Sequence, residues 1–271
     1  MPSIPITDPD DPRVAAYRAV RERDLVGRQG RFIVEGEVVL RVALTRARHR
    51  LESVFLAEPR LEALGDALSH LGDEVPVYVA AAEVMSRVIG FHLHRGVLAL
   101  GHRAPEPEAA ALLGALPSPA LALGLVGIAN HDNVGGLYRN AAAFGAGAVI
   151  RDRATCDPLY RKAIRVSVGA ALIQPSAQVR DAAEMVACLR AAGFEVLALT
   201  PRGREDLAAL RRSPRTALLV GSEGPGLPEA VLAQTRTVRI PMAAGFDSLN
   251  VATASGIALH HLASSPGDQP G

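Results

Sequence analysis

Leu121-Ala122-Leu123-Gly124-Leu125-Val126 is a nearly continuous apolar run. A run of this kind is typical of a strand that is covered on both faces, as in a parallel sheet. Further strand signals follow at 148–150, 195–199, 216–220 and 237–240. Segments with apolar residues at helical spacing lie between or after these strands, at 134–144, 181–192, 228–234 and 250–262. This alternation predicts a doubly wound parallel α/β sheet, with ligands expected outside the carboxyl ends of its strands.

The first part of the chain shows a shorter alternation. Strand signals lie at 32–34, 53–56, 75–79 and 96–100, and helical spacing at 37–46 and 61–71. We therefore expect a small α/β domain over 1–103, whose first twelve residues form a loose arm. Four prolines in 104–119 predict a linker. The larger domain then covers 120–263, and the polar tail 264–271 is expected to be disordered.

Composition narrows the class of protein. Apolar residues make up 49% and charged residues 21% of the 271 residues, as in an ordinary globular protein. No apolar run approaches the ~20 residues that span a bilayer, which argues against a transmembrane helix. The first residues have neither a basic region nor an apolar core, which argues against a signal peptide. Two cysteines, Cys156 and Cys188, cannot build a disulfide scaffold or a four-thiolate zinc site. These features predict a soluble cytoplasmic protein without a metal site.

Positive charge is concentrated near the start of the chain. Residues 13–50 hold ten arginines against four acidic residues, which gives 10 − 4 = +6 locally. An arginine fork can grip phosphate oxygens in pairs, so this segment is a candidate RNA surface. The alternative is that these arginines are ordinary solvated surface residues, and that arginine is frequent because the genome is GC-rich. Ten aromatic residues and no Trp argue against a base-stacking platform.

The loop 127–140 carries the first unusual motif of the larger domain. Asn133 is a good helix N-cap, and Gly135 and Gly136 let another backbone or a ligand come close. Arg139 lies six residues beyond this expected cap, in an otherwise small and apolar segment. Either Arg139 has a functional role, or it pairs with an acidic neighbour.

Two more loops follow predicted strands. Gly221-Ser222-Glu223-Gly224-Pro225-Gly226 has the wrong glycine spacing for a dinucleotide fingerprint, and Glu223 would repel a pyrophosphate. An acidic, glycine-lined turn suits a positively charged nucleoside better. The segment 240–256 passes from Ile240-Pro241-Met242 into a helix of small residues, for which Ser248 or Asn250 would be the cap.

Together these segments resemble the three motifs of the SpoU (TrmH-like) family of RNA 2′-O-ribose methyltransferases, in the SPOUT superfamily. Asn133-x-Gly135-x-x-x-Arg139 is similar to motif 1, Gly221–Gly226 to motif 2, and Ile240-Pro241-Met242 with Ser248-Leu249-Asn250-Val251 to motif 3. Residues 165–170 also resemble a family segment. The chain departs from the family at Asn130-His131-Asp132 and at Asn140, which affects the loop expected to face RNA.

The resemblance implies a trefoil-knotted carboxyl-terminal domain, a smaller L30e-like RNA-binding domain, and a homodimer formed through the knotted domain. It implies S-adenosylmethionine as cofactor and rRNA or tRNA as substrate. The expected cofactor-binding residues are Thr200, Gly221, Glu223, Gly224, Ile240, Met242, Leu249 and Asn250. At Gly221 we expect a side chain to fill the space of the ligand.

The same resemblance assigns catalysis to Arg139, with Asn133 fixing the loop or the RNA backbone nearby. A guanidinium is a poor base because it stays protonated, so Arg139 is expected to stabilise the developing alkoxide and grip the adjacent phosphate. His131 is read as a solvated loop histidine, with a role as base the less favoured alternative. An inactive RNA-binding relative and a nucleotide-dependent oxidoreductase are the alternative functions.

Overall fold

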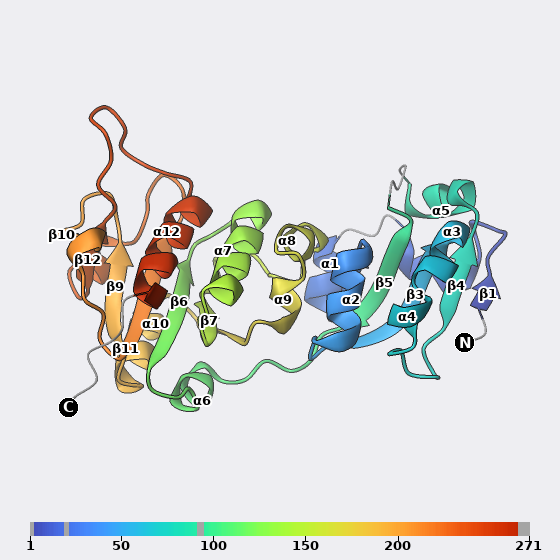
Figure 1. Cartoon of the computed structure of the whole chain (residues 1–271), viewed down its shortest axis with the longest axis horizontal. Coiled ribbons are helices and arrows are strands. Elements are labelled where there is room, and N and C mark those ends of the chain that lie inside the picture. The colour runs from blue at the N-terminus through green and yellow to red at the C-terminus, as the bar shows by residue number, and fades with distance from the viewer. Residues whose placement is uncertain (1–2, 19–21, 91–94, 265–271) are drawn as a thin grey trace. The chain divides into compact units, whose positions relative to one another are not determined.

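A computed structural model describes residues 3–18, 22–90 and 95–264 of the chain (Figure 1). By its internal contacts the chain divides into two compact units. The first consists of residues 1–105 and 157–173, and the second of residues 106–156 and 174–271. Residues 157–173, placed in the larger domain by the sequence analysis, thus group with the first unit.

The first unit is built around a mixed sheet. Its described strands are β1 (Ser3–Pro5), β2 (Arg31–Glu35), β3 (Arg50–Ala57), β4 (Val77–Ala80) and β5 (Val97–His102), in the order β1-β4-β3-β5-β2. β1, β4 and β3 are parallel, whereas β5 runs antiparallel to β3 and β2. The helices of this unit are η1 (Pro12–Tyr17), α1 (Glu22–Gln29), α2 (Glu37–Thr45), α3 (Glu58–Ala63), α4 (Gly65–Leu68), α5 (Ala82–Ile89), α8 (Arg161–Val166) and α9 (Ala170–Ile173).

Two sequence expectations fail in this unit. Residues 3–12, the described part of the expected loose arm, are not loose, because β1 pairs with β4 and Ile6 is buried in the core. The segment 61–71 does not form one helix, because Leu64 lies between the short helices α3 and α4. Leu64 is fully buried, so packing at this position takes precedence over helical continuity.

The second unit contains the predicted parallel sheet. Its described strands are β6 (Ala120–Val126), β7 (Ala148–Arg151), β8 (Ser176–Gln178), β9 (Glu195–Leu199), β10 (Glu205–Asp206), β11 (Arg215–Gly221) and β12 (Arg236–Arg239). Their order is β10-β12-β9-β11-β6-β7-β8, and every described pair is parallel. The α/β class and the parallel sheet are therefore confirmed.

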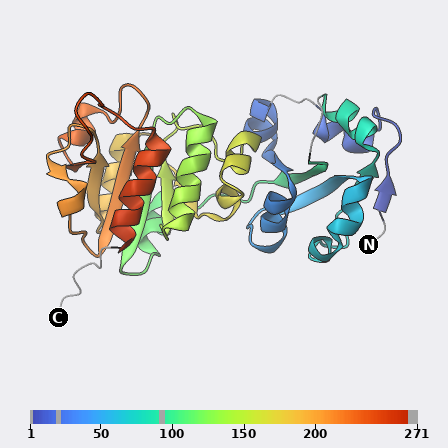
Figure 2. The same cartoon turned by 45° about the horizontal axis from the view of Figure 1, so that its top comes forward.

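Helices cover both faces of this sheet, which is why β6 is buried along its whole length. One face packs against α6 (Ala109–Gly114), α10 (Ala182–Ala191) and α11 (Glu229–Leu232). The other face carries α7 (His131–Ala143) and α12 (Val251–Ser264), which lie side by side in Figures 1 and 2. The expected linker 104–119 contains α6, whose Leu113 is fully buried. Of the expected tail 264–271, Ser264 ends α12 and the rest lies outside the described residues.

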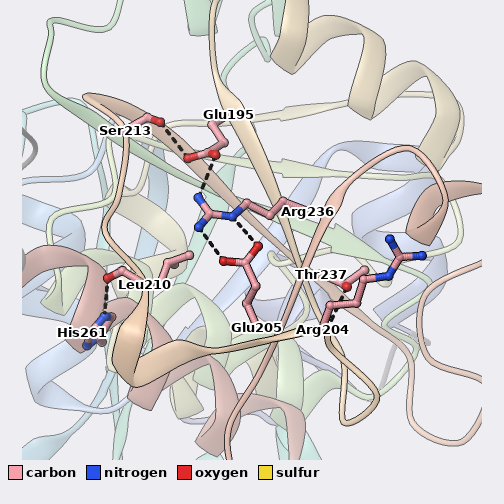
Figure 3. A network of polar contacts seen from close by, with 8 residues as sticks. All are labelled: Glu195, Arg204, Glu205, Leu210, Ser213, Arg236, Thr237 and His261. Carbon is pink, nitrogen blue, oxygen red and sulfur yellow. Dashed lines mark hydrogen bonds and ion pairs between the residues drawn. The ribbon is translucent and has the colours of Figure 1, made fainter.

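An ionic network fixes the β10 edge of the sheet (Figure 3). The Arg236 guanidinium donates to both carboxylate oxygens of Glu205, at 2.7 and 2.6 Å, and to Glu195 at 3.0 Å. Ser213 donates to the other Glu195 oxygen at 2.7 Å. These bonds to Arg236 hold the pKa of Glu205 below its usual value. The network thus ties the two-residue strand β10 to β12 and β9.

Candidate active site

A cavity of about 440 Å³ opens where β9, β11 and β12 end. These three strands are neighbours in the sheet, so their carboxyl ends bring together loops that are far apart in the sequence. The volume lies within the range of small-molecule sites. The position of the cavity agrees with the ligand site predicted from the alternation of strands and helices.

All eight residues predicted to bind the cofactor line this cavity. They are Thr200, Gly221, Glu223, Gly224, Ile240, Met242, Leu249 and Asn250. Sequence reasoning missed further lining residues: Leu199, Pro201, Val220, Ser222, Gly226, Leu227, Ser248, Val251 and Ala254. Four of these, Ser222, Gly226, Ser248 and Val251, lie inside motifs 2 and 3, and Leu199, Pro201, Val220 and Leu227 directly adjoin a predicted residue or a motif end, so assigning whole motifs with one flanking position would have found all but Ala254.

Glu223 connects the three motif segments. Its Oε1 accepts a hydrogen bond from the Asn133 amide at 2.6 Å and a longer one from the Asn250 amide at 3.5 Å. The Asn250 amide also donates to Asn133 Oδ1 at 2.9 Å. Asn133 is buried, whereas Glu223 is exposed at the cavity wall. One carboxylate therefore holds the helix of motif 1 against the loops of motifs 2 and 3.

The N-cap of α7 differs from the sequence prediction, whereas that of α12 agrees with it. α7 begins at His131, and its N-cap is Asn130, whose side chain accepts from Asp132 N at 2.8 Å. Asn133 is therefore not a cap but lies inside the helix, where its amide is available to Glu223. Asn250 does cap α12, because its Oδ1 accepts from Ala252 N at 2.9 Å.

α7 and α12 pack closely through small residues. A Cβ placed at Gly136 would lie 2.7 Å from that of Ala252, so this position requires glycine. Asn140, where the chain departs from the family pattern, donates to Ala252 O at 2.6 Å and Ser255 Oγ at 3.0 Å. Asn140 therefore provides hydrogen bonds between α7 and α12.

Gly221 is required for a different reason from the one expected. A Cβ at this position would lie 2.3 Å from the Gly226 carbonyl carbon and 2.5 Å from Leu227 N. The space beside Gly221 is occupied by the backbone of its own turn and not by a ligand. A bulky replacement would consequently disrupt the turn that presents Glu223.

Arg139 lies apart from the cavity lining. It is exposed on α7, and its side chain makes no hydrogen bond or ion pair with any residue that the structure describes. The alternative of pairing with an acidic neighbour is therefore wrong. His131 is the half-buried first residue of α7 and not a loop residue. In the described part of the chain, no group of three or more His, Cys, Asp or Glu side chains could hold a metal ion.

The sequence pattern that defines the SpoU rRNA Methylase family matches residues 120–260. An uncharacterised tRNA/rRNA methyltransferase of Mycobacterium bovis is 42% identical over 265 residues, which cover 94% of this chain and 90% of the relative. The chain belongs to the SpoU methylase family. This assignment confirms the resemblance read from the three motifs.

Solved structures of the SpoU family share the fold of this chain. An rRNA methyltransferase from Sinorhizobium meliloti, solved with AdoMet (S-adenosylmethionine) bound, has a TM-score of 0.81 at 24% identity, over 96% of this chain and 97% of that one. A structure described as an RNA 2′-O ribose methyltransferase has a TM-score of 0.74 at 26% identity, over 95% and 97% of the two chains. No helix within the described residues could span a membrane.

The hydrogen bonds that Glu223 accepts lead to a prediction about thermal stability. Glu223→Ala leaves the amides of Asn133 and Asn250 without their shared acceptor, so we expect the melting temperature to fall by about 2–6 °C. Glu223→Gln keeps an acceptor oxygen but loses the charge, so its melting temperature should fall less than that of Glu223→Ala. Scanning calorimetry measures both variants.

Glu229→Ala is the matched control, because Glu229 is an exposed carboxylate in the same unit whose partner Arg202 is also exposed. Its melting temperature should stay within about 1 °C of the parent. An unchanged melting temperature in Glu223→Ala would show that the hydrogen bonds from Asn133 and Asn250 to Glu223 contribute nothing to stability.

Proposed function

We propose that this chain transfers a methyl group from S-adenosylmethionine to a ribose 2′-OH of rRNA or tRNA. The observation that carries the proposal is the single cavity lined by all eight residues predicted to bind this cofactor. The AdoMet bound to the Sinorhizobium meliloti relative supports the cofactor, and the RNA 2′-O ribose methyltransferase supports the ribose as acceptor.

The cavity fits this cofactor in size and chemistry. Its apolar wall, which includes Leu199, Val220 and Ile240, suits an adenine ring, and the adjoining backbone suits the polar edges of a nucleoside. The carboxylate of Glu223 stands at the same wall and attracts the positive sulfonium. When bound, S-adenosylmethionine supplies an electrophilic methyl group. Glu223 would repel the pyrophosphate of a dinucleotide, which disfavours the oxidoreductase alternative.

Arg139 is the residue we assign to catalysis. Because it is exposed and has no partner among the described residues, its guanidinium is available to RNA. A fork of this kind stabilises charge that develops on the attacking 2′-oxygen and binds the neighbouring phosphate. Asn133 does not contact RNA in this account. Through Glu223 it fixes α7, the helix that presents Arg139.

Arg139→Ala is the experiment that tests the proposal. Methylation should fall about 100-fold or more, as it does when a preorganised donor to the transition state is lost. Cofactor affinity should hardly change, because Arg139 does not line the cavity. Arg139→Lys should restore little activity, since a point charge does not reproduce the fork. Single-turnover methylation and calorimetry with S-adenosylmethionine provide the two measurements.

Arg153→Ala serves as the control, because Arg153 is another exposed arginine of the same unit. It should methylate at the parent rate. A folded, cofactor-binding Arg139→Ala protein with parental activity would end the catalytic assignment. Cofactor binding without methylation in the parent itself would favour the inactive RNA-binding relative, and binding of NAD in place of S-adenosylmethionine would favour the oxidoreductase.

Only part of the arginine-rich segment 13–50 has guanidinium groups available to RNA. Among the described residues, several of its arginines are paired with carboxylates: Arg13 with Asp11, Arg18 with Asp10, Arg31 with Glu52, and Arg41 with Glu37 and Asp66. Arg46, Arg48 and Arg50 are exposed, and their side chains make no hydrogen bond or ion pair with a described residue. We propose that these three bind RNA phosphates in the smaller, L30e-like domain.

Replacing Arg46, Arg48 and Arg50 together with alanine should weaken RNA binding and lower its salt dependence. Three phosphate contacts contribute about 2–3 to the slope of log affinity against log salt. The double variant Arg31→Gln with Glu52→Gln removes a charge pair at constant net charge and should keep the parental slope. An unchanged slope in the triple variant would show that these arginines only face solvent. Titrations at several salt concentrations measure it.

We also propose a trefoil knot in the second unit, a homodimer formed through it, and a cytoplasmic location, as the family resemblance implies. The dimer has a suitable surface on α12, where Ile257 is 43% exposed. Ile257 borders a second, shallower hollow with Leu207, Ala208 and Pro241. A second subunit seated on this surface would remove the apolar side chain of Ile257 from water.

Ile257→Asp should shift the protein from dimer toward monomer, because a charge would have to be buried at the contact. Analytical ultracentrifugation measures the change, with Val38→Asp, an exposed apolar position on α2 of the other unit, as the control. A parent that sediments as a monomer at micromolar concentration would contradict the dimer.

A further inference from the structure

Phe246 is the one aromatic side chain that is exposed among the residues the structure describes. Its exposed fraction is 76%, whereas Phe32, Phe55 and Phe194 are buried in the cores of their units. Leu249 of the same loop is also 41% exposed, so this loop offers apolar surface that a flat partner could cover.

The position of Phe246 relates it to the candidate active site. It lies in the loop between β12 and α12, and Figure 1 shows this loop, in dark orange, projecting beyond the neighbouring elements of its unit. Met242, Ser248 and Leu249 of the same loop line the cavity, whereas Phe246 does not. Phe246 is thus two to four residues along the chain from residues that line the cavity.

The tip has a defined backbone shape. Phe246 N donates to Ala243 O at 3.2 Å, and Gly245 has a φ of +90°, which closes the turn directly before the ring. A Cβ at Gly245 would meet nothing within 4 Å, so the space beside the turn is open. The ring is presented by an ordered turn with small neighbours, which lets a flat partner approach.

The chemistry of the tip favours a nucleobase over the other parts of an RNA. Phe246 has no polar atom with which to bind a phosphate or a ribose hydroxyl, and the adjacent Asp247 repels phosphate. Unpaired bases stack on aromatic rings, and because every base has a π-face one ring is sufficient for such a contact. A single ring also agrees with a chain that has too few aromatic residues for a stacking platform.

We propose that Phe246 stacks on an unpaired base of the substrate RNA beside the nucleotide to be methylated. This inference rests on the proposed function, since it takes RNA as the substrate of the cavity. Phe246 is thereby a residue that selects unpaired over duplex RNA. It is not a catalytic residue, because the reacting atoms lie at the cavity.

The test measures RNA affinity apart from turnover. The probes are a fluorescein-labelled RNA hairpin with an unpaired loop and a blunt duplex of the same stem, titrated by fluorescence anisotropy. Phe246→Ala should weaken binding of the hairpin about 5-fold to 100-fold and leave the duplex unchanged. Phe246→Tyr should restore affinity, whereas Phe246→Leu, which keeps apolar bulk without a flat ring, should not.

Three further readouts separate stacking from other roles of the ring. The salt slope of Phe246→Ala should equal that of the parent, because a neutral side chain releases no counterions. S-adenosylmethionine affinity and the sedimentation coefficient should also be unchanged. Val38→Ala, an exposed apolar truncation on α2, is the control and should bind the hairpin normally.

Parental hairpin affinity in Phe246→Ala, or full restoration by Phe246→Leu, overturns the stacking inference. Loss of cofactor affinity in Phe246→Ala overturns it in favour of a ring that covers the cofactor. Dissociation into monomers overturns it in favour of a dimer contact. The proposed function fails separately, if the parent protein transfers no methyl group to RNA although it binds the hairpin.

Discussion

The arrangement of the site depends on one carboxylate that accepts hydrogen bonds from two amides. Glu223 lies in the turn after β11, Asn133 in the first turn of α7, and Asn250 at the start of α12. Hydrogen bonds to a charged acceptor are stronger than neutral ones, and the bond between Asn250 and Asn133 closes the set. The loops that line the cavity and the helix of Arg139 are thereby held in one geometry, although the residues that set it are up to 117 positions apart.

Close backbone approach is the second constraint on the site. At Gly221 the turn folds back on Gly226, and at Gly136 α7 meets α12 without room for another side chain. These glycines create the space in which Glu223 can reach Asn133. Asn140 then adds a polar bond between the same helices. Gly221, Glu223 and Asn250 thus both line the cavity and bring its walls together.

The sequence predicted much of this arrangement, for identifiable reasons. A continuous apolar run marks a strand buried on both faces, and β9 was predicted with its observed limits of 195 and 199. The cavity residues could be predicted because they follow such strands and match family motifs. The cap at Asn133 was predicted wrongly, because Asn130 is equally suited to capping and only the tertiary contact with Glu223 decides between them. The two-residue strand β10 has no periodicity to detect, since its pairing depends on Arg236, which is remote in the sequence.

The most direct test of the central claim is to identify the atom that receives the methyl group. RNA is incubated with the protein and S-adenosylmethionine labelled in its methyl group, and the product is hydrolysed in alkali. Alkaline cleavage requires a 2′-OH, so a methylated ribose leaves the label in a resistant dinucleotide. The account predicts that the label is recovered in such dinucleotides. Label in single nucleotides, which would place the methyl group on a base, would contradict it.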